Sequence, residues 1–368
     1  MFQSSFKMRF TPADKVHFTM IRCCKLGFLI GALFLAVAGC GGPDAVPVAP
    51  ATTPVSSVPV PPAPLREKAN VVIFLADAMR ADRLHCYGNS RPISPAIDSV
   101  AEKGYLFERC YSQASWTKPS VASLFTGRMP SVHQAVAAAA DSNDMSQRVQ
   151  ILRESFVTLA EMFKGASYTT AMFTMNGHCQ REYGFAQGID HYWYQHFAGA
   201  QREVDQALAW LDGVGKSPFF LYVHVKPPHQ PYNVSDETYR KLFNADPPGT
   251  SKDMTIVKNF GRVYAAAKSG RETKDGLRLS DLTPAGRDLV RQCYDAEVWQ
   301  ADQQFKRLLD KLDELGLREN TTIVVVSDHG DELWEHGVMG HGHSLYEELI
   351  HVPLIICPAG NKTATRIP

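Results

Sequence analysis

The sequence carries no excess of charge of either sign and no internal repeat. Among its 368 residues, 38 are Lys or Arg and 38 are Asp or Glu, so the formal net charge at pH 7 is zero. Proteins that bind nucleic acids usually carry a basic excess, and the balance gives no electrostatic reason to expect such a partner. No repeated unit stands out in the sequence, so nothing indicates a repeat architecture.

Long apolar runs and cysteines are also scarce. Residues 26–38 form one apolar run near the amino terminus, and no second stretch approaches a membrane span. Of the 8 cysteines, those that follow Cys40 are at positions 86, 110, 179, 293 and 357. In an oxidising periplasm Cys86 and Cys110 could pair, but the odd number leaves at least one thiol free or intermolecular.

The amino terminus, residues 1–40, resembles a bacterial lipoprotein signal peptide. The apolar run Leu26 to Ala38 follows basic residues and leads into Val37-Ala38-Gly39-Cys40, with Cys40 as the acylated residue. A core helix is the alternative, but the run is short even for a membrane span, and Met20 is a possible start. We therefore expect a lipid anchor at Cys40. Since Gly41 gives no inner-membrane retention signal, we expect this anchor in the outer membrane of a bacterial envelope, facing the periplasm or the exterior.

The following segment, residues 41–66, is rich in Pro, Val, Ala and Ser. Such a composition cannot bury enough apolar area to fold, so we expect an extended tether. Residues 67–368 should then form the folded domain. With 45% apolar residues in the whole chain, there is ample material for one α/β core.

Strands and helices are expected to alternate along this domain. Fully buried parallel strands give near-continuous apolar runs, and helices repeat their apolar positions about every 3.6 residues. We therefore expect strands at 70–76, 168–173, 219–225, 321–327 and 352–357, and a long helix at 285–315. The residues of that helix that we expect in the core are Tyr294, Val298, Phe305, Leu308, Leu312 and Leu315.

Two of the expected strands lead directly into acidic residues. The strand at 321–327 is followed by Asp328 and His329, and the strand at 70–76 is followed by Asp77. In open α/β sheets, functional groups gather beyond the carboxyl ends of the strands. A single Asp in that place is more often a cap or turn residue. Two such strand ends together with an imidazole indicate a metal site.

A third feature is the segment from Ser115 to Gly127. Pro119 suits the first turn of a helix, because its missing N–H is not needed there, so Thr117 lies just ahead of a helix N-terminus. The free amides and the dipole of such an end favour an anion. A hydroxyl in that place can serve as a nucleophile, and a simple helix cap is the alternative.

These features, taken with several others, resemble the sulfatase branch of the alkaline phosphatase superfamily. The resemblance runs from about Asn70 to Pro358 in the family's order. Its motifs are Asp77 with Arg80 and Asp82, Tyr87-Gly88, Ser94 to Asp98, Thr117 to Gly127, Pro228 to Tyr232, Ser327 to Gly330, and Gly340 to His343. No single motif is decisive, but the ordered set is specific.

The resemblance implies an alkaline-phosphatase-like sandwich with a largely parallel central β-sheet flanked by helices. It also implies a metal-dependent hydrolase or transferase of phosphate or sulfate esters, with Thr117 at the position of the nucleophile. The metal ligands that it implies are Asp77, Thr117, Asp328 and His329. Mixed oxygen and nitrogen ligands suit zinc or manganese, and calcium is possible.

The resemblance also implies contacts with the substrate. His229 and His341 match positions where the family contacts the substrate anion or, in some members, a second metal. Asn176 and His343 are expected to bind the substrate as well, a small-molecule ester or an ester of an envelope glycan or lipid. A lone loop histidine is more often a solvated residue, and the resemblance raises His229 above that reading while His224 stays below it.

Two further segments follow from the same resemblance. Residues 233–282 resemble the variable insertion that covers the active site in this family, and we expect them to set the choice of substrate. After the strand expected at 352–357, the family usually continues with another strand and a helix. Since this chain stops at Pro368, we expect its carboxy-terminal part to be short or truncated.

The sequence departs from the sulfatase pattern in three places. Sulfatases of this kind begin the helix with Cys-x-Pro-x-Arg, whose Cys is oxidised to formylglycine, whereas this chain has Thr117 and Val121 at these two positions. No aldehyde can form from a threonine. Thr174 to His178 stands where many members have a Lys-Trp-His stretch that helps bind sulfate. Pro227 stands where the family usually has an Asp.

A threonine at the nucleophile position resembles the phosphoethanolamine and phosphoglycerol transferases of the same superfamily. Its hydroxyl can attack phosphorus in line and leave a phosphothreonine that water or an acceptor alcohol resolves. We therefore expect phosphoester chemistry, on phosphodiesters in particular, through Thr117. Sulfuric ester hydrolysis is the alternative, and an inactive lipid-anchored binding protein is the third possibility.

Overall fold

The computed structural model describes residues 68–136, 151–196, 199–215, 217–232 and 234–368. The expected signal peptide at 1–40 and the expected tether at 41–66 lie outside these residues. Among the helices of the described part, none has the length and apolar character needed to cross a membrane.

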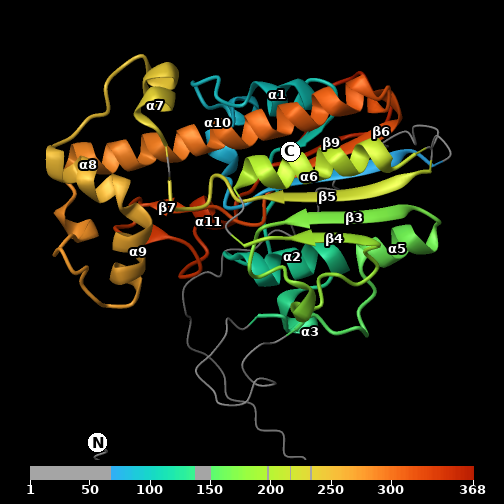
Figure 1. Cartoon of the computed structure of the whole chain (residues 1–368), viewed down its shortest axis with the longest axis horizontal. Helices are drawn as coiled ribbons and strands as arrows, with labels where there is room; N and C mark the ends of the chain where they lie inside the picture. The colour runs from blue at the N-terminus through green and yellow to red at the C-terminus, as the bar shows by residue number, and fades with distance from the viewer. Residues whose placement is uncertain (1–67, 137–150, 197–198, 216, 233) are drawn as a thin grey trace, which may run out of the picture. The chain divides into compact units, whose positions relative to one another are not determined.

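One large sheet forms the centre of the domain (Figure 1). Its strands are β1 (Asn70–Ala76), β2 (Tyr105–Phe107), β3 (Thr169–Thr174), β4 (His191–Tyr194), β5 (Phe219–Val225), β6 (Thr321–Val326), β9 (Leu354–Cys357) and β10 (Thr365–Ile367). Across the described residues the strand order is β10-β2-β9-β6-β1-β5-β3-β4. In this sheet β9 runs antiparallel to both of its neighbours, and the other pairings are parallel. The expected largely parallel α/β sheet is confirmed.

Strand β1 lies in the middle of the sheet, between β5 and β6. Leu75 of β1 is in register with Val326 of β6, and Ala76 is in register with Val225 of β5. Because these parallel strands end at the same edge, the residues that follow them are brought together.

Helices cover both faces of the sheet. They are α1 (Pro95–Ala101), α2 (Thr117–Thr126), α5 (Leu159–Gly165), α6 (Ala200–Gly213) and α10 (Pro284–Glu314). Val72 and Phe74 of β1 belong to a core shared with α1, α6 and α10, which lie above the sheet in Figure 1. Ile73 and Leu75 belong to a second core with α2, below the sheet in Figure 1, and with α5. Alternate residues of a strand face opposite sides, so burial on both sides explains the unbroken apolar sequence of β1.

The long helix α10 matches the helix expected at 285–315. Thr283 caps it by accepting from the backbone N–H of Gly286, and Pro284 occupies its first position. The residues predicted to be in the core and found fully or almost fully buried are Tyr294, Val298, Phe305, Leu308 and Leu312. Leu315 follows the last turn of the helix and packs, partly buried, against the same core.

The described part of the expected insertion is helical. It contains α7 (Asp236–Phe243), α8 (Ser251–Lys258), α9 (Phe260–Lys268) and a 3-10 turn, η4 (Leu279–Asp281). These helices lie together beside the first turns of α10, at the left in Figure 1. Asp253 of α8 accepts from the backbone N–H of Thr283 at 2.9 Å, and Ile256 shares a core with Leu289. The insertion is therefore tied to the same helix that covers the sheet.

Shorter elements complete the described domain. They are α3 (Pro130–His133), α11 (Glu347–Ile350), the hairpin strands β7 (Glu332–Leu333) and β8 (Met339–Gly340), and the 3-10 turns η1 (Ala81–Arg83), η2 (His85–Tyr87), η3 (Arg181–Tyr183) and η5 (Arg318–Asn320). The cysteines of the described residues are all free thiols, so the pairing suggested for Cys86 and Cys110 is not formed. Burial raises the pKa of the Cys110 thiol to about 11, which keeps it protonated.

The contact between Phe305 of α10 and Phe74 of β1 provides a test of this packing. The two ring centroids are 4.8 Å apart, and both side chains are fully buried. We expect Phe305→Ala to lower the free energy of unfolding by about 3–5 kcal/mol, because it removes buried apolar area and leaves a cavity. Urea denaturation followed by circular dichroism measures the loss. The exposed neighbour variant Lys306→Ala is the control, and an equal loss in both would contradict the assigned packing.

Candidate metal centre

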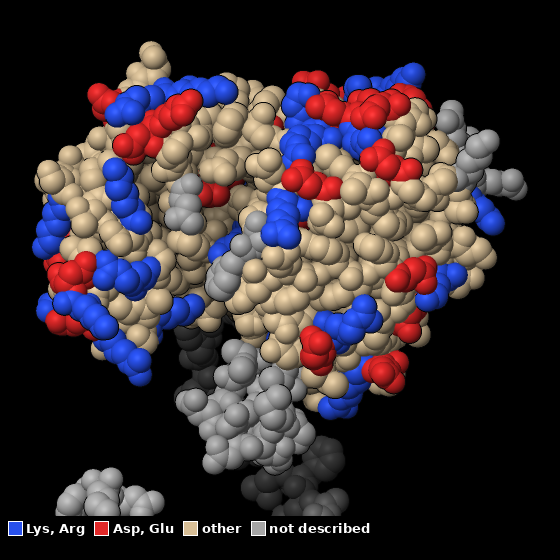
Figure 2. All heavy atoms as spheres, in the orientation of Figure 1, with Lys and Arg blue, Asp and Glu red and all other residues tan. Residues whose placement is uncertain are grey.

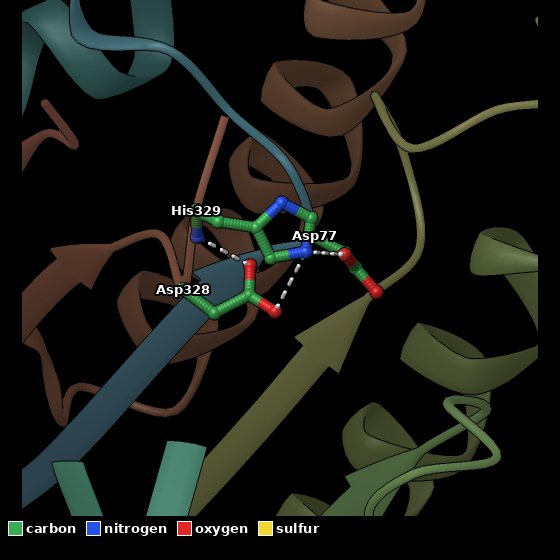
Figure 3. Close-up of side chains that lie close together, drawn as sticks. All are labelled: Asp77, Asp328 and His329. Carbon is green, nitrogen blue, oxygen red and sulfur yellow. Dashed lines mark hydrogen bonds and ion pairs between the residues drawn. The ribbon is translucent and has the colours of Figure 1, made fainter. Parts of the chain in front are cut away.

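The ends of β1 and β6 bring Asp77, Asp328 and His329 together, as Figure 3 shows. The Nε2 atom of His329 lies 3.5 Å from Oδ1 of Asp77 and 3.6 Å from Oδ2 of Asp328. One potential ligand atom from each residue lies within 4.8 Å of the others, and all three residues are buried. The sequence prediction that these strand ends converge is therefore confirmed.

Backbone hydrogen bonds fix the positions of these side chains. The N–H of Asp77 donates to the carbonyl of Val225 at 2.9 Å, which continues the β1 and β5 pairing past the strand end. The N–H of Ala78 donates to Oδ1 of Asp328 at 3.1 Å, and the N–H of His329 donates to the same oxygen at 3.0 Å. One carboxylate oxygen of Asp328 is thus occupied by amides, and the other is directed toward His329.

His329 is held in the tautomer that a metal ligand needs. Its Nδ1 atom lies 2.9 Å from the carbonyl oxygen of Gly330, so Nδ1 carries the hydrogen and donates it. The lone pair is then on Nε2, which faces Asp77 and Asp328. Gly330 itself tolerates no side chain, because a Cβ there would lie 2.1 Å from the backbone oxygen of Glu348.

The donor set fits a divalent cation. Oδ1 of Asp77 and Oδ2 of Asp328 are buried and have no hydrogen-bond partner among the described residues. Burial and the negative charge of Asp77 raise the pKa of Asp328. Burial would raise the pKa of Asp77 too, but the surrounding histidines, His229 first, hold it well below its usual range. Two unpaired carboxylate oxygens beside an imidazole lone pair form a site for a cation of mixed oxygen and nitrogen ligation.

Thr117 also lies next to this group. It belongs to α2, which covers the face of the sheet opposite to α10. It is the first residue of α2 rather than the residue ahead of it, with Trp116 in the N-cap position. Its Oγ1 lies 3.4 Å from Nε2 of His329, and the side-chain amide of Asn176 donates to it at 3.4 Å. Asn176 also donates to Oδ2 of Asp77. Asn176 therefore bridges the threonine hydroxyl and one candidate metal ligand.

The rings of two loop histidines, His229 and His341, lie beside the ring of His329. The ring centroid of His341 is 4.4 Å from that of His329 and 4.8 Å from that of His229. Nδ1 of His341 contacts Oδ1 of Asp331 at 2.7 Å, and Tyr232 donates to the other oxygen of Asp331 at 3.0 Å. Burial, followed by the nearby His329, lowers the pKa of His341 to about 4, and the Asp331 carboxylate opposes this shift.

His343 has a different environment from His341. Its Nε2 contacts Oε2 of the fully buried Glu332 at 2.9 Å, and the imidazole is about one third exposed, with a side-chain fraction of 30%. It lines the pocket beside the metal centre rather than the ligand cluster itself. The structure thus separates two histidines that the sequence motif Gly340 to His343 presents together.

Two residues of the site gave no signal that the sequence analysis used. His224, which we ranked below His229, is fully buried in β5, with Nε2 3.4 Å from Oδ2 of Asp77. Tyr222 contacts its Nδ1 at 3.2 Å. Asp331 orients His341, as described above. Two signals could have identified them. One is a histidine at the next-to-last position of an otherwise apolar strand, and the other is an acid three residues after Asp328.

Arg80 connects the loops that follow β1 and β6. It is almost fully buried and pairs with Asp82 at 2.7 Å and with Glu335 at 2.6 Å, and it donates to the carbonyl of Asp331 at 3.1 Å. Burial opposes its charge, but these anionic partners outweigh burial and raise the pKa of the guanidinium. The planar, permanently charged guanidinium therefore holds the two ligand-bearing loops in one arrangement.

A pocket of about 760 Å³ opens beside Trp116, the residue before Thr117, between the sheet edge and the insertion. We call it the α9 pocket. Its walls include Trp116 before α2, Tyr264 and Lys268 of α9, and Trp334, His341 and His343 of the loops after β6. On the face shown in Figure 2, basic and acidic residues are interspersed, in agreement with the balanced composition.

Comparison with known families decides the relationship. A profile of the sulfatase family matches residues 69–367. The chain belongs to the sulfatase family. The resemblance that the ordered motifs indicated is confirmed, and the site residues described above lie within the matched region.

Curated members of the sulfatase family are related to this chain over most of its length. Iduronate 2-sulfatase of Homo sapiens is 26% identical over 343 residues, which cover 80% of this chain and 60% of that protein. Delta 4,5-hexuronate-2-O-sulfatase of Bacteroides thetaiotaomicron is 24% identical over 319 residues, which cover 81% of this chain and 63% of that protein. The chain thus spans about three fifths of the length of these relatives.

Solved structures agree with this fold. Phosphonate monoester hydrolase of Agrobacterium radiobacter has a TM-score of 0.62 at 19% identity, over 81% of this chain and 70% of that chain. A 2-O GAG sulfatase has a TM-score of 0.61 at 18% identity, over 82% of this chain and 66% of that chain. The expected alkaline-phosphatase-like sandwich of the sulfatase family is confirmed.

Removal of one candidate ligand tests the metal centre without reference to activity. We expect Asp328→Asn to lower the metal content after dialysis by about 10-fold or more, because it replaces a charged oxygen ligand with a neutral amide. Metal per protein chain is measured by inductively coupled plasma mass spectrometry. Asp246→Asn, which changes an exposed acid outside the cluster, is the control. Equal metal content in the wild type and Asp328→Asn would remove Asp328 from the ligand set.

Proposed function

We propose that this protein is a metal-dependent hydrolase that removes sulfate from a saccharide ester. The names of its relatives support the sulfuric ester, since iduronate 2-sulfatase and delta 4,5-hexuronate-2-O-sulfatase are sulfatases of sugars by name. The observation that carries the proposal is the convergence of one hydroxyl, Thr117, with a buried acidic and imidazole cluster and two further histidines. The names of these relatives support the sulfuric ester, our alternative from the sequence, over the phosphoester that we expected from Thr117.

The residues that would hold the metal are Asp77, Asp328 and His329, with the Thr117 hydroxyl beside them. Mixed carboxylate and imidazole ligands suit zinc or manganese, with calcium possible. When bound, the cation would draw negative charge from the ester oxygens and make the hydroxyl more acidic. Asn176 would orient that hydroxyl through the hydrogen bond that it donates to Oγ1.

The reaction that we propose has two steps. The Thr117 oxygen attacks the sulfur and loses its proton, while the bond between the sulfur and the sugar oxygen breaks and the sugar oxygen gains a proton. Water then attacks the sulfur of the sulfothreonine, which releases sulfate and restores the threonine. His229 and His341, whose rings lie beside that of His329, would contact the anion oxygens and exchange protons.

A second candidate function is hydrolysis of phosphate esters through the same threonine. The specific observation in its favour is Thr117 itself, which stands at the position of the formylglycine cysteine and cannot become an aldehyde. A phosphothreonine is resolved by attack of water or an alcohol at phosphorus, without that aldehyde. The two candidates share the metal centre and differ in the atom that is attacked.

Matched substrates and Thr117 variants test both candidates. For the proposed function, the wild type should cleave 4-nitrophenyl sulfate faster than 4-nitrophenyl phosphate and bis(4-nitrophenyl) phosphate. Thr117→Ala should lower turnover by about 10³-fold or more, since the covalent route is lost, and Thr117→Ser should keep part of the activity. Release of 4-nitrophenol is followed by absorbance.

The controls separate the nucleophile from the fold. Thr126→Ala changes a threonine at the other end of α2 and should leave turnover close to that of the wild type. Faster cleavage of either phosphate would transfer the proposal to the second candidate. Turnover by Thr117→Ala close to the wild type would rule out the threonine as the nucleophile in both.

We further propose that the protein is tethered to a bacterial outer membrane through lipid on Cys40. The support is the Val37-Ala38-Gly39-Cys40 motif after a short apolar run, followed by the Pro-rich segment 41–66. Such a tether would keep the catalytic domain close to envelope or extracellular glycans.

Cys40→Ser tests the anchor. We expect the variant to leave the membrane fraction or to keep its signal peptide uncleaved, because the acylated thiol is absent. Fractionation and mass spectrometry of the mature amino terminus provide the measurement, with Cys357→Ser as the control. An unmodified Cys40 in the mature wild-type protein would rule out the anchor.

A further inference from the structure

The α9 pocket adjoins the metal centre through two of its lining residues. Trp116 immediately precedes Thr117, and His341 forms part of both the metal centre and the pocket wall. A group attached to an anion held at the centre would have this pocket beside it. The insertion supplies the opposite wall through Tyr264 and Lys268 of α9.

The positions of two aromatic side chains of the pocket, Trp334 and Tyr264, are fixed by their neighbours. Trp334 has a φ of 68°, a left-handed conformation that bulky residues avoid unless their surroundings impose it. Its backbone N–H donates to the carbonyl of Val338 at 2.8 Å, and the Arg287 guanidinium lies 5.6 Å from the centroid of its indole ring. Gly340 lies against Tyr264, because a Cβ on this glycine would be 1.8 Å from the tyrosine oxygen. The hairpin β7–β8 and helix α9 thus form one continuous wall.

Lys268 carries the one formal charge among the described residues that line the pocket. None of these residues is acidic, and burial lowers the pKa of His178 and of His341, which favours the neutral form of both histidines. Lys268 is exposed, and its ammonium lies 5.7 Å from the ring centroid of Tyr264. A wall of aromatic rings with one flexible cation is suited to an apolar ring face that carries a negative substituent.

We propose that the α9 pocket binds the sugar ring that carries the ester and that Lys268 pairs with a second anionic group on that ring. The pyranose would lie against Trp334, with its ester at Thr117 and its carboxylate or second sulfate toward α9. The protein would thus select esters of acidic saccharides over neutral ones. This inference rests on the proposed function in so far as the ester is cleaved next to the pocket.

Two ligands that differ in one carboxylate test the selection. Binding of glucuronic acid 2-sulfate and of glucose 2-sulfate is measured by isothermal titration calorimetry on metal-loaded Thr117→Ala protein, in which turnover is blocked. We expect the acidic sugar to bind about 5-fold more tightly, as befits one exposed ion pair. Lys268→Ala in the same background should bring the two affinities together. Lys274→Ala, an exposed lysine that does not line the pocket, should leave the preference intact.

A second variant tests the aromatic wall. Trp334→Ala should weaken both ligands by a similar factor, about 10-fold, because the stacking surface is shared while the ion pair is kept. Its thermal unfolding is recorded alongside. Unchanged binding by a folded Trp334→Ala protein would overturn the wall as the sugar platform.

The outcomes separate this inference from the proposed function. Cleavage of 4-nitrophenyl sulfate by the wild type together with equal binding of the two sugars would overturn the pocket assignment and leave the hydrolase. A carboxylate preference that depends on Lys268, in a protein that cleaves no ester, would support the pocket and overturn the hydrolase. A preference that survives Lys268→Ala would overturn the role of this lysine.

Discussion

Two buried carboxylates that face one imidazole are the constraint around which this domain is organised. Asp77 and Asp328 each direct an unpaired oxygen toward His329, in a place without water-exposed surface. Bringing like charges together under such burial is costly unless a cation lies between them. Hydrogen bonds from Ala78 and Asn176 and the histidines around Asp77 offset part of this cost, yet the pKa of Asp328 remains raised. The arrangement is therefore more consistent with a cation site than with a purely structural cluster.

The architecture follows from how this cluster is positioned. Only neighbouring parallel strands that end in register can deliver acidic residues to one point, and β1 and β6 do so at the middle of the sheet. Arg80 then holds together the two loops that leave these strands. Helix α2 brings the hydroxyl of Thr117 from the other side of the sheet. The centre is thus built from segments about 250 residues apart, which the sheet alone makes adjacent.

Much of the fold could be predicted from the sequence, because buried strands and long amphipathic helices carry strong local patterns. The strands at 70–76 and 219–225 and the helix near 285–315 were found where the apolar periodicity indicated. The ligand cluster was predictable for the same reason, since Asp77, Asp328 and His329 directly follow such strands. The start of α2 was displaced by one position, as expected where caps and helix ends compete.

Other parts of the site depend on contacts that no local pattern encodes. His224 is a single polar residue within the otherwise apolar strand β5. Only the pairing of β1 with β5 brings it close to Asp77. Trp334 lies in a short loop, and its place in the pocket wall depends on an unusual backbone angle and on the approach of α9. The position of the insertion helices is set by tertiary packing against α10, so the pocket itself could not be predicted.

The length of α10 has a consequence for how such enzymes diversify. One continuous helix of 31 residues carries the insertion on its first turns and the sheet on its last ones. Loops and helices of the insertion can therefore change by mutation without altering the strand ends that carry Asp77, Asp328 and His329. Conversely, a small tilt of this rod would move α9 relative to the hydroxyl at α2 and alter the width of the pocket. Helix α10 thus connects the variable insertion with the part of the sheet that carries Asp77, Asp328 and His329.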